Sequence, residues 1–393
     1  MTIIKKQARK FLLSRHGLLG EYVFDGKEGV MSFVRRVGCV QYDPVDICGR
    51  NADIVLHSRI KGYSAKTLEE LLYADRRLID FFDKNLSVFP VEDYPFFLNA
   101  RLSGGYAEAY DRRGGDAVRQ TEPLIRAFLD KNEYVSAKDL GVDSTIEWHW
   151  GTMSSLPRAA LESMYFRGEL IIHHKTGTNK SYAFTKDYIP DGIMNSTPPF
   201  ATETERLAWL VKRRIGAVGM LWNKASDAWL GLRLKAAERS AAFRQLLDAG
   251  EIFEITTEGI KDRLFVLEDE RAALMTALSG GDAPARMEFL APLDSLLWDR
   301  NLIEAVFGFA YKWEIYTPKE KRKYGPYTLP VLYGDAFIGR IDMARRDGRL
   351  VINDIWYEDG RTPSKEVLAA LEEYLDRYSI FANCTGRERT SRA

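Results

Sequence analysis

Apolar side chains near the start of the chain recur every three to four residues. In residues 5–16, Ala8, Phe11, Leu12 and Arg15 fall on one face of a helix. The same spacing predicts further helices over residues 28–37, 51–60, 64–75 and 364–378. Helical segments therefore dominate the first part of the chain and close its last part.

A second pattern, alternating or β-branched, indicates strands. Two short examples lie at residues 40–43 and 78–83, and they would give the first segment a wing-like hairpin if they pair across the sheet. The remaining strands gather in the last third of the chain, at residues 311–317, 327–334, 336–346 and 349–358. The two patterns together predict an α+β fold.

An internal repeat gives the clearest view of the organisation. Residues 165–185 resemble residues 246–268, with Gly-Glu-Leu at 168–170 matching Gly-Glu-Ile at 250–252. Each copy predicts a helix, a glycine that ends it in a left-handed cap, a strand, a tight turn and a return strand. Helical material precedes both copies, and this order is that of a winged helix-turn-helix.

The repeat and the turn signals divide the chain into four parts. We expect winged helix-turn-helix units at residues 1–118, 119–197 and 198–282, and a β-rich C-terminal part with a terminal helix at 283–393. Proline and glycine pairs at 198–199 and 280–281 mark both ends of the third unit.

Charge and cysteine content narrow the function classes. The 393 residues carry 56 basic and 56 acidic side chains, so the chain is not basic overall. Its basic residues are clustered, however, as in PKEKRKYG at 318–325, and can present a positive face to phosphate. Three cysteines without a CxxC pair argue against a zinc site or a disulfide framework. No apolar run is long enough to span a membrane, and we expect a cytoplasmic protein.

The sequence VGCVQYDPVDICGR, at residues 37–50, carries the candidate chemistry. Strand side chains alternate, so Gln41 and Asp43 are expected on one face and Tyr42 on the other. An ordinary polar face followed by an Asp-Pro turn explains this spacing too, and spacing alone favours that simpler reading. No nucleotide-binding, metalloprotease or nucleophile-elbow motif accompanies the pair.

Basic residues supply candidate contacts to phosphate. A predicted hairpin tip carries Lys175 and Lys180, and a solvated tip is an equally good explanation. The expected DNA-binding set also includes Arg50 and the run 319–325, where Tyr324 is available to stack; from this run we select Lys319, Lys321, Arg322 and Lys323. For Arg50, a salt bridge or a helix cap is the simpler role.

The longest motifs resemble a known family. The segments QARKFLLSRHGLLG, VGCVQYDPVDICGRNADIVLHSRI and LDSLLWDRNLIEAVFGFAYKWEIYTPKEKRKYGPYTLPVLYGD are similar to those of the AlkZ/YcaQ group of winged-helix DNA glycosylases. The similarity covers nearly the whole chain, from about residue 7 to about residue 356.

The resemblance implies both a fold and an activity. It implies a C-shaped molecule of three tandem winged units followed by a β-barrel-like subdomain. It also implies an enzyme that hydrolyses the glycosidic bond of N7-alkylated purines in duplex DNA and can unhook interstrand crosslinks. We expect the enzyme to be a monomer. The family signature falls on Gln41, Tyr42 and Asp43, with Gln41 and Asp43 catalytic. No metal or other cofactor is implied, and no lysine in the motif offers Schiff-base chemistry.

One position departs from the family pattern. Lys84 stands about where these enzymes carry a histidine, which affects the expected lesion range. The competing hypothesis is a non-catalytic winged-helix DNA-binding protein of the transcriptional-regulator kind, which would bind DNA without releasing a base.

Overall fold

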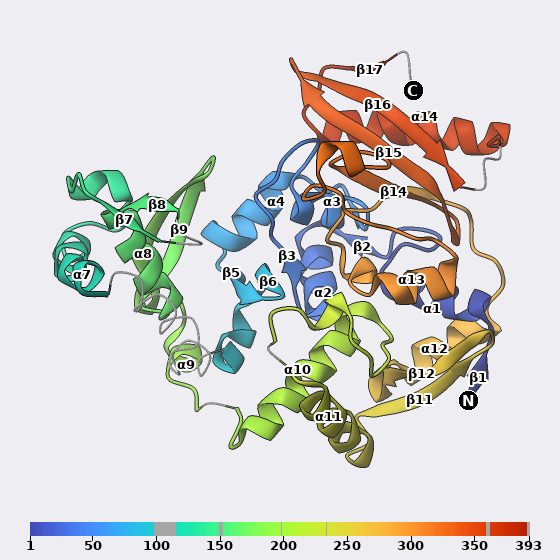
Figure 1. Cartoon of the computed structure of the whole chain (residues 1–393), viewed down its shortest axis with the longest axis horizontal. Coiled ribbons are helices and arrows are strands. Elements are labelled where there is room, and N and C mark those ends of the chain that lie inside the picture. The colour runs from blue at the N-terminus through green and yellow to red at the C-terminus, as the bar shows by residue number, and fades with distance from the viewer. Residues whose placement is uncertain (98–114, 149–151, 198, 233, 359–361, 391–393) are drawn as a thin grey trace. The chain divides into compact units, whose positions relative to one another are not determined.

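The computed structural model describes residues 1–97, 115–148, 152–197, 199–232, 234–358 and 362–390 (Figure 1). Its contacts divide the chain into two compact units. Unit 1 comprises Met1–Glu69, Phe81–Phe89 and Thr202–Ala393, and unit 2 comprises Glu70–Asp80 and Pro90–Ala201. The finer division of the chain at residues 118, 197 and 282 stays a prediction.

The first helices of unit 1 form where the apolar periodicity predicts them. They are α1 (Lys5–Arg15), α2 (Gly26–Val37), α3 (Asn51–His57) and α4 (Ala65–Glu69). Gly17 (φ 66°) and Gly38 (φ 78°) follow α1 and α2 with left-handed backbone, which a glycine adopts without steric cost. The predicted helix over 64–75 changes at its midpoint into a π-helical turn, Glu70–Ala74.

A small sheet stands beside these helices, in the order β3 (Val40–Gln41), β6 (Asn85–Pro90) and β5 (Leu78–Asp83). Residues 40–43 therefore do not pair with residues 78–83. The sequence forms a tight β5–β6 hairpin instead, and β6 lies between the other two strands.

The rest of the helical part of unit 1 comes from residues after 202. It consists of α10 (Glu203–Val218), α11 (Ala236–Asp248), the hairpin β11 (Ile252–Thr257) and β12 (Ile260–Leu267), α12 (Arg271–Ser279) and α13 (Arg300–Phe307). Short parallel pairings join β1 (Thr2–Ile3) to β11, and β2 (Phe24–Asp25) to β4 (Ile60–Lys61). The start of the chain thus packs on the third predicted unit.

Unit 2 contains the other copy of the repeat. Its elements are α7 (Gly115–Leu129), β7 (Thr145–Glu147), β8 (Met153–Ser155), α8 (Leu156–Phe166), the hairpin β9 (Leu170–Thr176) and β10 (Asn179–Phe184), and α9 (Asp191–Met194). Gly168 (φ 81°) and Gly250 (φ 68°) precede the two hairpins in left-handed conformation. The helix, glycine and hairpin order predicted from the repeat is confirmed in both copies.

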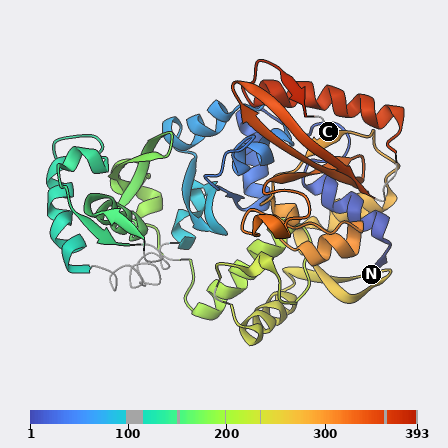
Figure 2. The same cartoon turned by 45° about the horizontal axis from the view of Figure 1, so that its top comes forward.

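The C-terminal strands form one sheet within unit 1. Its order is β13 (Met287–Phe289), β14 (Thr328–Tyr333), β15 (Ala336–Arg346), β16 (Arg349–Tyr357) and β17 (Arg387–Arg389). Helix α14 (Lys365–Phe381) lies along this sheet and packs through Tyr374 on Phe289, with ring centroids 4.4 Å apart (Figure 2). Among the described strands β13 and β17 remain edges, so their order is that of an open sheet.

Two local predictions in this region need correction. Residues 311–317 are irregular rather than a strand, because their polar groups bind a loop described below. Leu368, expected on the apolar face of the last helix, is exposed, whereas Leu371 and Leu375 are buried. No described helix combines the length and the apolar character that a membrane crossing requires.

Candidate active site

The Gln41-Tyr42-Asp43 segment lies at the end of the small sheet. Gln41 pairs with Ser87 of β6, and the backbone N–H of Tyr42 donates to the Leu86 carbonyl at 2.8 Å. The strand itself ends at Gln41, two residues earlier than the alternation predicts. Asp43 is therefore the first side chain beyond the paired backbone.

Asp43 is fixed by the turn that follows it. Its Oδ1 accepts the backbone N–H of Val45 at 2.9 Å, a local bond typical of an aspartate in a turn. The side chain is half-buried. Burial raises the pKa of this carboxyl, and the bond from Val45 only partly opposes the rise. Within the described residues no lysine or arginine forms an ion pair with Asp43.

Gln41 differs from the prediction. Its side chain is buried, with the residue only 6% exposed, so it does not share an open face with Asp43. Its Oε1 is also buried and has no hydrogen-bond donor among the described residues. An unsatisfied buried amide oxygen costs about 1–3 kcal/mol. The fold thus retains a polar acceptor here that packing alone would not select.

Tyr42 anchors the segment from the other side. Its ring is buried, and its hydroxyl accepts a bond from Arg50 Nη1 at 3.1 Å. Arg50 also pairs with Asp53 at 2.5 Å, and the hydroxyl of Tyr63 donates to the same carboxylate at 2.6 Å. These bonds fix the backbone of the motif against the start of α3.

The turn after Asp43 is fastened to the C-terminal sheet. Arg345 of β15 donates its backbone N–H to the Ile47 carbonyl at 2.8 Å, and its guanidinium pairs with Asp46 at 2.5 Å. Tyr327, which precedes β14, reaches the Gly49 carbonyl at 3.5 Å. The motif is thereby held between elements that lie far apart in the sequence.

Lys84 occupies the β5–β6 turn, two residues before Leu86. It is 4% exposed, and its Nζ lies over the Trp298 ring, 5.4 Å from the centroid. Burial, together with the nearby Arg214 guanidinium, lowers the pKa of Lys84 to about 8. The carboxylate of the preceding residue, Asp83, forms ion pairs with the guanidinium groups of Arg213 and Arg214, at 2.7 and 2.6 Å. The departure from the family pattern thus places a buried amine with a lowered pKa in the turn between β5 and β6.

The two lysines predicted at the hairpin tip of unit 2 lie back from it. Gly177 and Thr178 form the tip, while Lys175 and Lys180 face each other across the strands. Lys175 Nζ bonds Asp80 at 2.5 Å and its side chain is 11% exposed. Lys180 Nζ lies 4.0 Å from Glu162. Neither side chain stands free at the tip as the sequence suggested.

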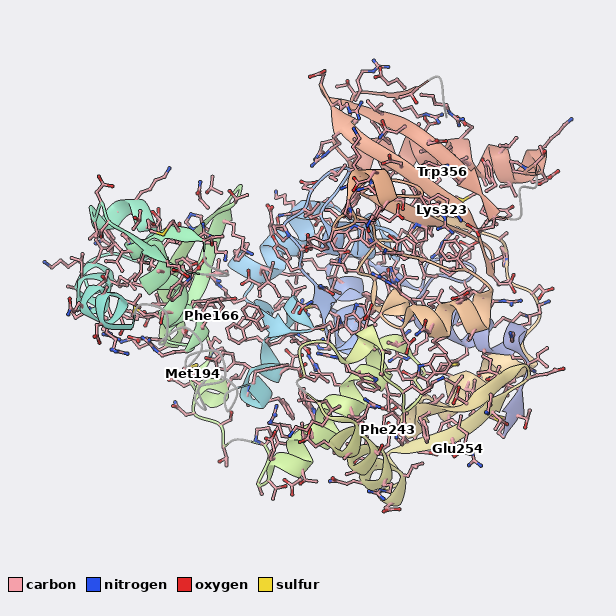
Figure 3. All side chains as sticks on the ribbon, viewed as in Figure 1. Phe166, Met194, Phe243, Glu254, Lys323 and Trp356 are labelled. Carbon is pink, nitrogen blue, oxygen red and sulfur yellow. The ribbon has the colours of Figure 1, made fainter. Side chains whose placement is uncertain are left out.

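The other predicted DNA contacts fall into two groups. Arg50 precedes α3 and takes the ion-pair role without a capping hydrogen bond from its side chain, and Arg322 donates to the carbonyls of Thr317 and Ile315. Lys319, Lys321 and Lys323 are exposed. Tyr324, expected to be available for stacking, contacts Trp356 edge to face instead. Figure 3 labels Trp356 of β16 and Lys323, the residue before Tyr324.

A cavity of about 930 Å³ in unit 1 was not foreseen from the sequence. Its lining includes Asp227, Asp299, Arg300, Tyr311 and Arg340. Asp227 and Arg300 also act electrostatically on Lys84, so this part of the cavity lining lies near the β5–β6 turn. Its residues come from several separate segments, so no local spacing could have indicated it.

Side chains that could bind a metal ion do not cluster in the part of the chain that the structure describes. No cluster of at least three His, Cys, Asp or Glu side chains there could hold an ion. The motif itself offers one carboxylate, that of Asp43, and one amide, that of Gln41.

Comparison with known proteins gives two findings. A family model described as "DNA glycosylase AlkZ-like" matches residues 34–381. The fold is similar to that of the solved Streptomyces sahachiroi DNA glycosylase AlkZ, with a TM-score of 0.65 over 99% of this chain and 100% of that chain. The two sequences are 16% identical, so this second likeness concerns the fold.

Proposed function

Because the chain belongs to the AlkZ-like DNA glycosylase family, we propose that it hydrolyses the N-glycosidic bond of N7-alkylated purines in duplex DNA. The observation that carries the proposal is Asp43, a half-buried carboxylate without an ion-pair partner among the described residues. Such a group stabilises a positive charge that develops next to it.

Alkylation at N7 makes the purine cationic, so the base leaves with the bonding electron pair and needs no proton. The deoxyribose then carries the positive charge at C1′ and O4′. Asp43 lies opposite this charge and accepts a proton from the water that attacks C1′. The products are the free base and an abasic site.

Gln41 acts through its amide. The Oε1 acceptor, which has no donor among the described residues, is suited to hold the attacking water or the sugar. Because this oxygen is buried in the free protein, the role requires that the side chains around Gln41 move when substrate binds. This role accounts for a buried polar side chain at the end of a strand.

We propose hydrolysis without a lyase step. The motif contains no lysine, and the nearest one in the β5–β6 turn, Lys84, is buried against Trp298. The proposal extends to interstrand crosslinks joined through N7, which present the same cationic leaving group. It also includes a monomer acting in the cytoplasm, built from three winged helix-turn-helix units followed by a β-rich C-terminal part.

The rival function, a non-catalytic winged-helix regulator, is weakened for unit 2 by one observation, whereas in the other copy of the repeat α11 exposes Arg244 and Leu247. Helix α8 stands where a recognition helix precedes a wing, and all its residues except Leu156 and Arg158 are buried. A recognition helix must expose its side chains to the edges of the bases.

The test is incubation of the protein with duplex DNA that contains N7-methylguanine. We expect free N7-methylguanine and strand breaks that appear only after alkali treatment. Breaks without alkali would show a lyase step, and DNA binding without base release would support the regulator.

A further inference from the structure

One aromatic side chain of unit 1 is far more exposed than packing explains. Tyr316, in the irregular segment that replaces the predicted strand, is 83% exposed. Its ring edge meets Trp313 with centroids 5.6 Å apart, and this is its one ring contact in the described chain. Tyr324, the residue that the sequence predicts to stack, instead packs against Trp356.

The loop that carries Tyr316 is firmly held. The buried carboxylate of Glu314 accepts the backbone N–H groups of Lys323 at 3.0 Å, Tyr324 at 2.9 Å and Gly325 at 3.2 Å. Arg322 closes the loop by donating to two carbonyls on its other side. An exposed ring on a fixed loop loses little conformational entropy when it binds a partner.

The charge around the ring is positive. Lys312, Lys319, Lys321 and Lys323 are exposed, and none has an ion-pair partner among the described residues. Glu320 is the one exposed carboxylate between them. An aromatic surface surrounded by lysines is the arrangement that binds nucleobases by stacking and their phosphates by charge.

Ring contacts link Tyr316 to the candidate active site. Trp313 also meets Tyr327, with centroids 6.0 Å apart, and Tyr327 reaches the Gly49 carbonyl in the turn that follows Asp43. The stacking platform and the carboxylate therefore belong to one packed region of unit 1.

We propose that Tyr316 stacks on an unpaired nucleobase of the DNA substrate, while Lys319, Lys321 and Lys323 contact the neighbouring phosphates. The inference rests on the proposed function, because it takes DNA as the substrate. It adds a residue and a mode of contact that the catalytic motif does not supply.

The test uses a duplex with 2-aminopurine opposite an abasic site, and the same duplex fully paired. We expect the full-length protein and Tyr316→Phe to quench the fluorescence of the unpaired 2-aminopurine. Tyr316→Ala should lose this quenching and bind the unpaired duplex on the order of tenfold more weakly, with little change for the paired duplex. The substituted side chain is exposed, so thermal unfolding should be unchanged.

A charge variant separates stacking from phosphate contact. In the double variant Lys319→Gln, Lys321→Gln, the slope of log binding constant against log salt concentration should correspond to about two fewer neutralised phosphates. The quenching of bound DNA should stay intact. Equal quenching by Tyr316→Ala and the unchanged protein would overturn the inference, as would an equal affinity loss on both duplexes. Absence of DNA binding by the unchanged protein would instead contradict the proposed function.

Discussion

At the scale of single residues, the site combines two side chains that the fold does not satisfy. Asp43 is partly removed from water without a cation to pair with, and Gln41 buries an acceptor that has no donor in the described chain. Both conditions cost folding free energy, and both suit groups that bind a cationic sugar and a water.

The first prediction concerns Gln41→Met, which keeps the volume and removes the unsatisfied oxygen. We expect the free energy of unfolding to stay equal or rise by about 1 kcal/mol, while base release slows about 100-fold through loss of orientation. Urea unfolding and single-turnover excision measure the two effects. Gln245→Met is the matched control, because Gln245 also has a buried oxygen without a donor among the described residues. Full activity in Gln41→Met would remove Gln41 from the mechanism.

The second prediction concerns pH. Asp43 must be ionised to act, and burial raises its pKa above the ordinary aspartate value of about 3.9. The excision rate, corrected for spontaneous base loss, should therefore fall as pH is lowered through this raised pKa. In Asp43→Asn the acidic limb should be absent. The same limb in that variant would assign the titration to another group.

At this scale the resemblance to the family, not the spacing of polar residues, points to Gln41 and Asp43, and their catalytic role stays a prediction. The environment of the two side chains could not be predicted from the sequence. Their burial depends on where β3 ends and on β6, which intervenes between β3 and β5. Alternation along one strand contains no information about either.

At the scale of elements, helix caps and turn glycines were predicted correctly where the backbone groups bond to residues nearby in the sequence. Ser364 accepts the N–H of Val367 and starts α14 at the predicted place, and the glycines before both repeat hairpins adopt the expected conformation. The strand predicted at residues 311–317 is absent. The carboxylate of Glu314 binds backbone N–H groups nine to eleven residues further along the chain, and the segment does not join a sheet.

The third prediction follows from this carboxylate. Burial acts to raise the pKa of Glu314, but the N–H donors from the loop outweigh it and hold the pKa below its ordinary value. Glu314→Gln replaces an acceptor oxygen by a donor and should destabilise the loop by about 1–3 kcal/mol. Trypsin should then cleave faster at Lys319, Lys321 and Lys323. Glu320→Gln, an exposed neighbour, should leave the cleavage rate unchanged, and equal rates in both variants would contradict the assigned role.

At the scale of the whole molecule, unit 1 is assembled from distant parts of the chain. Arg59, just after α3, pairs with Asp294, ahead of α13, at 2.8 Å and a separation of 235 residues. Both side chains are fully buried. Sequence periodicity cannot reveal such a contact. The winged units were therefore predicted as consecutive segments, whereas the contacts join the first and last parts of the chain in unit 1.

The fourth prediction tests this connection. Asp294→Asn leaves the Arg59 guanidinium buried without its counter-charge, and we expect a loss of about 3–5 kcal/mol in the free energy of unfolding. Chemical denaturation measures it. Asp282→Asn removes an exposed partner of Lys6 and Lys10 and should have little effect. A small effect of Asp294→Asn would show that the buried pair does not hold the two parts together.

The central claim is tested most directly by the single-turnover rate of N7-methylguanine release from duplex DNA, measured for the unchanged protein and for Asp43→Asn at equal DNA occupancy. The account predicts rapid release by the unchanged protein and a rate at least about 100-fold lower in the variant, with DNA affinity retained. Equal release rates from both proteins would contradict it.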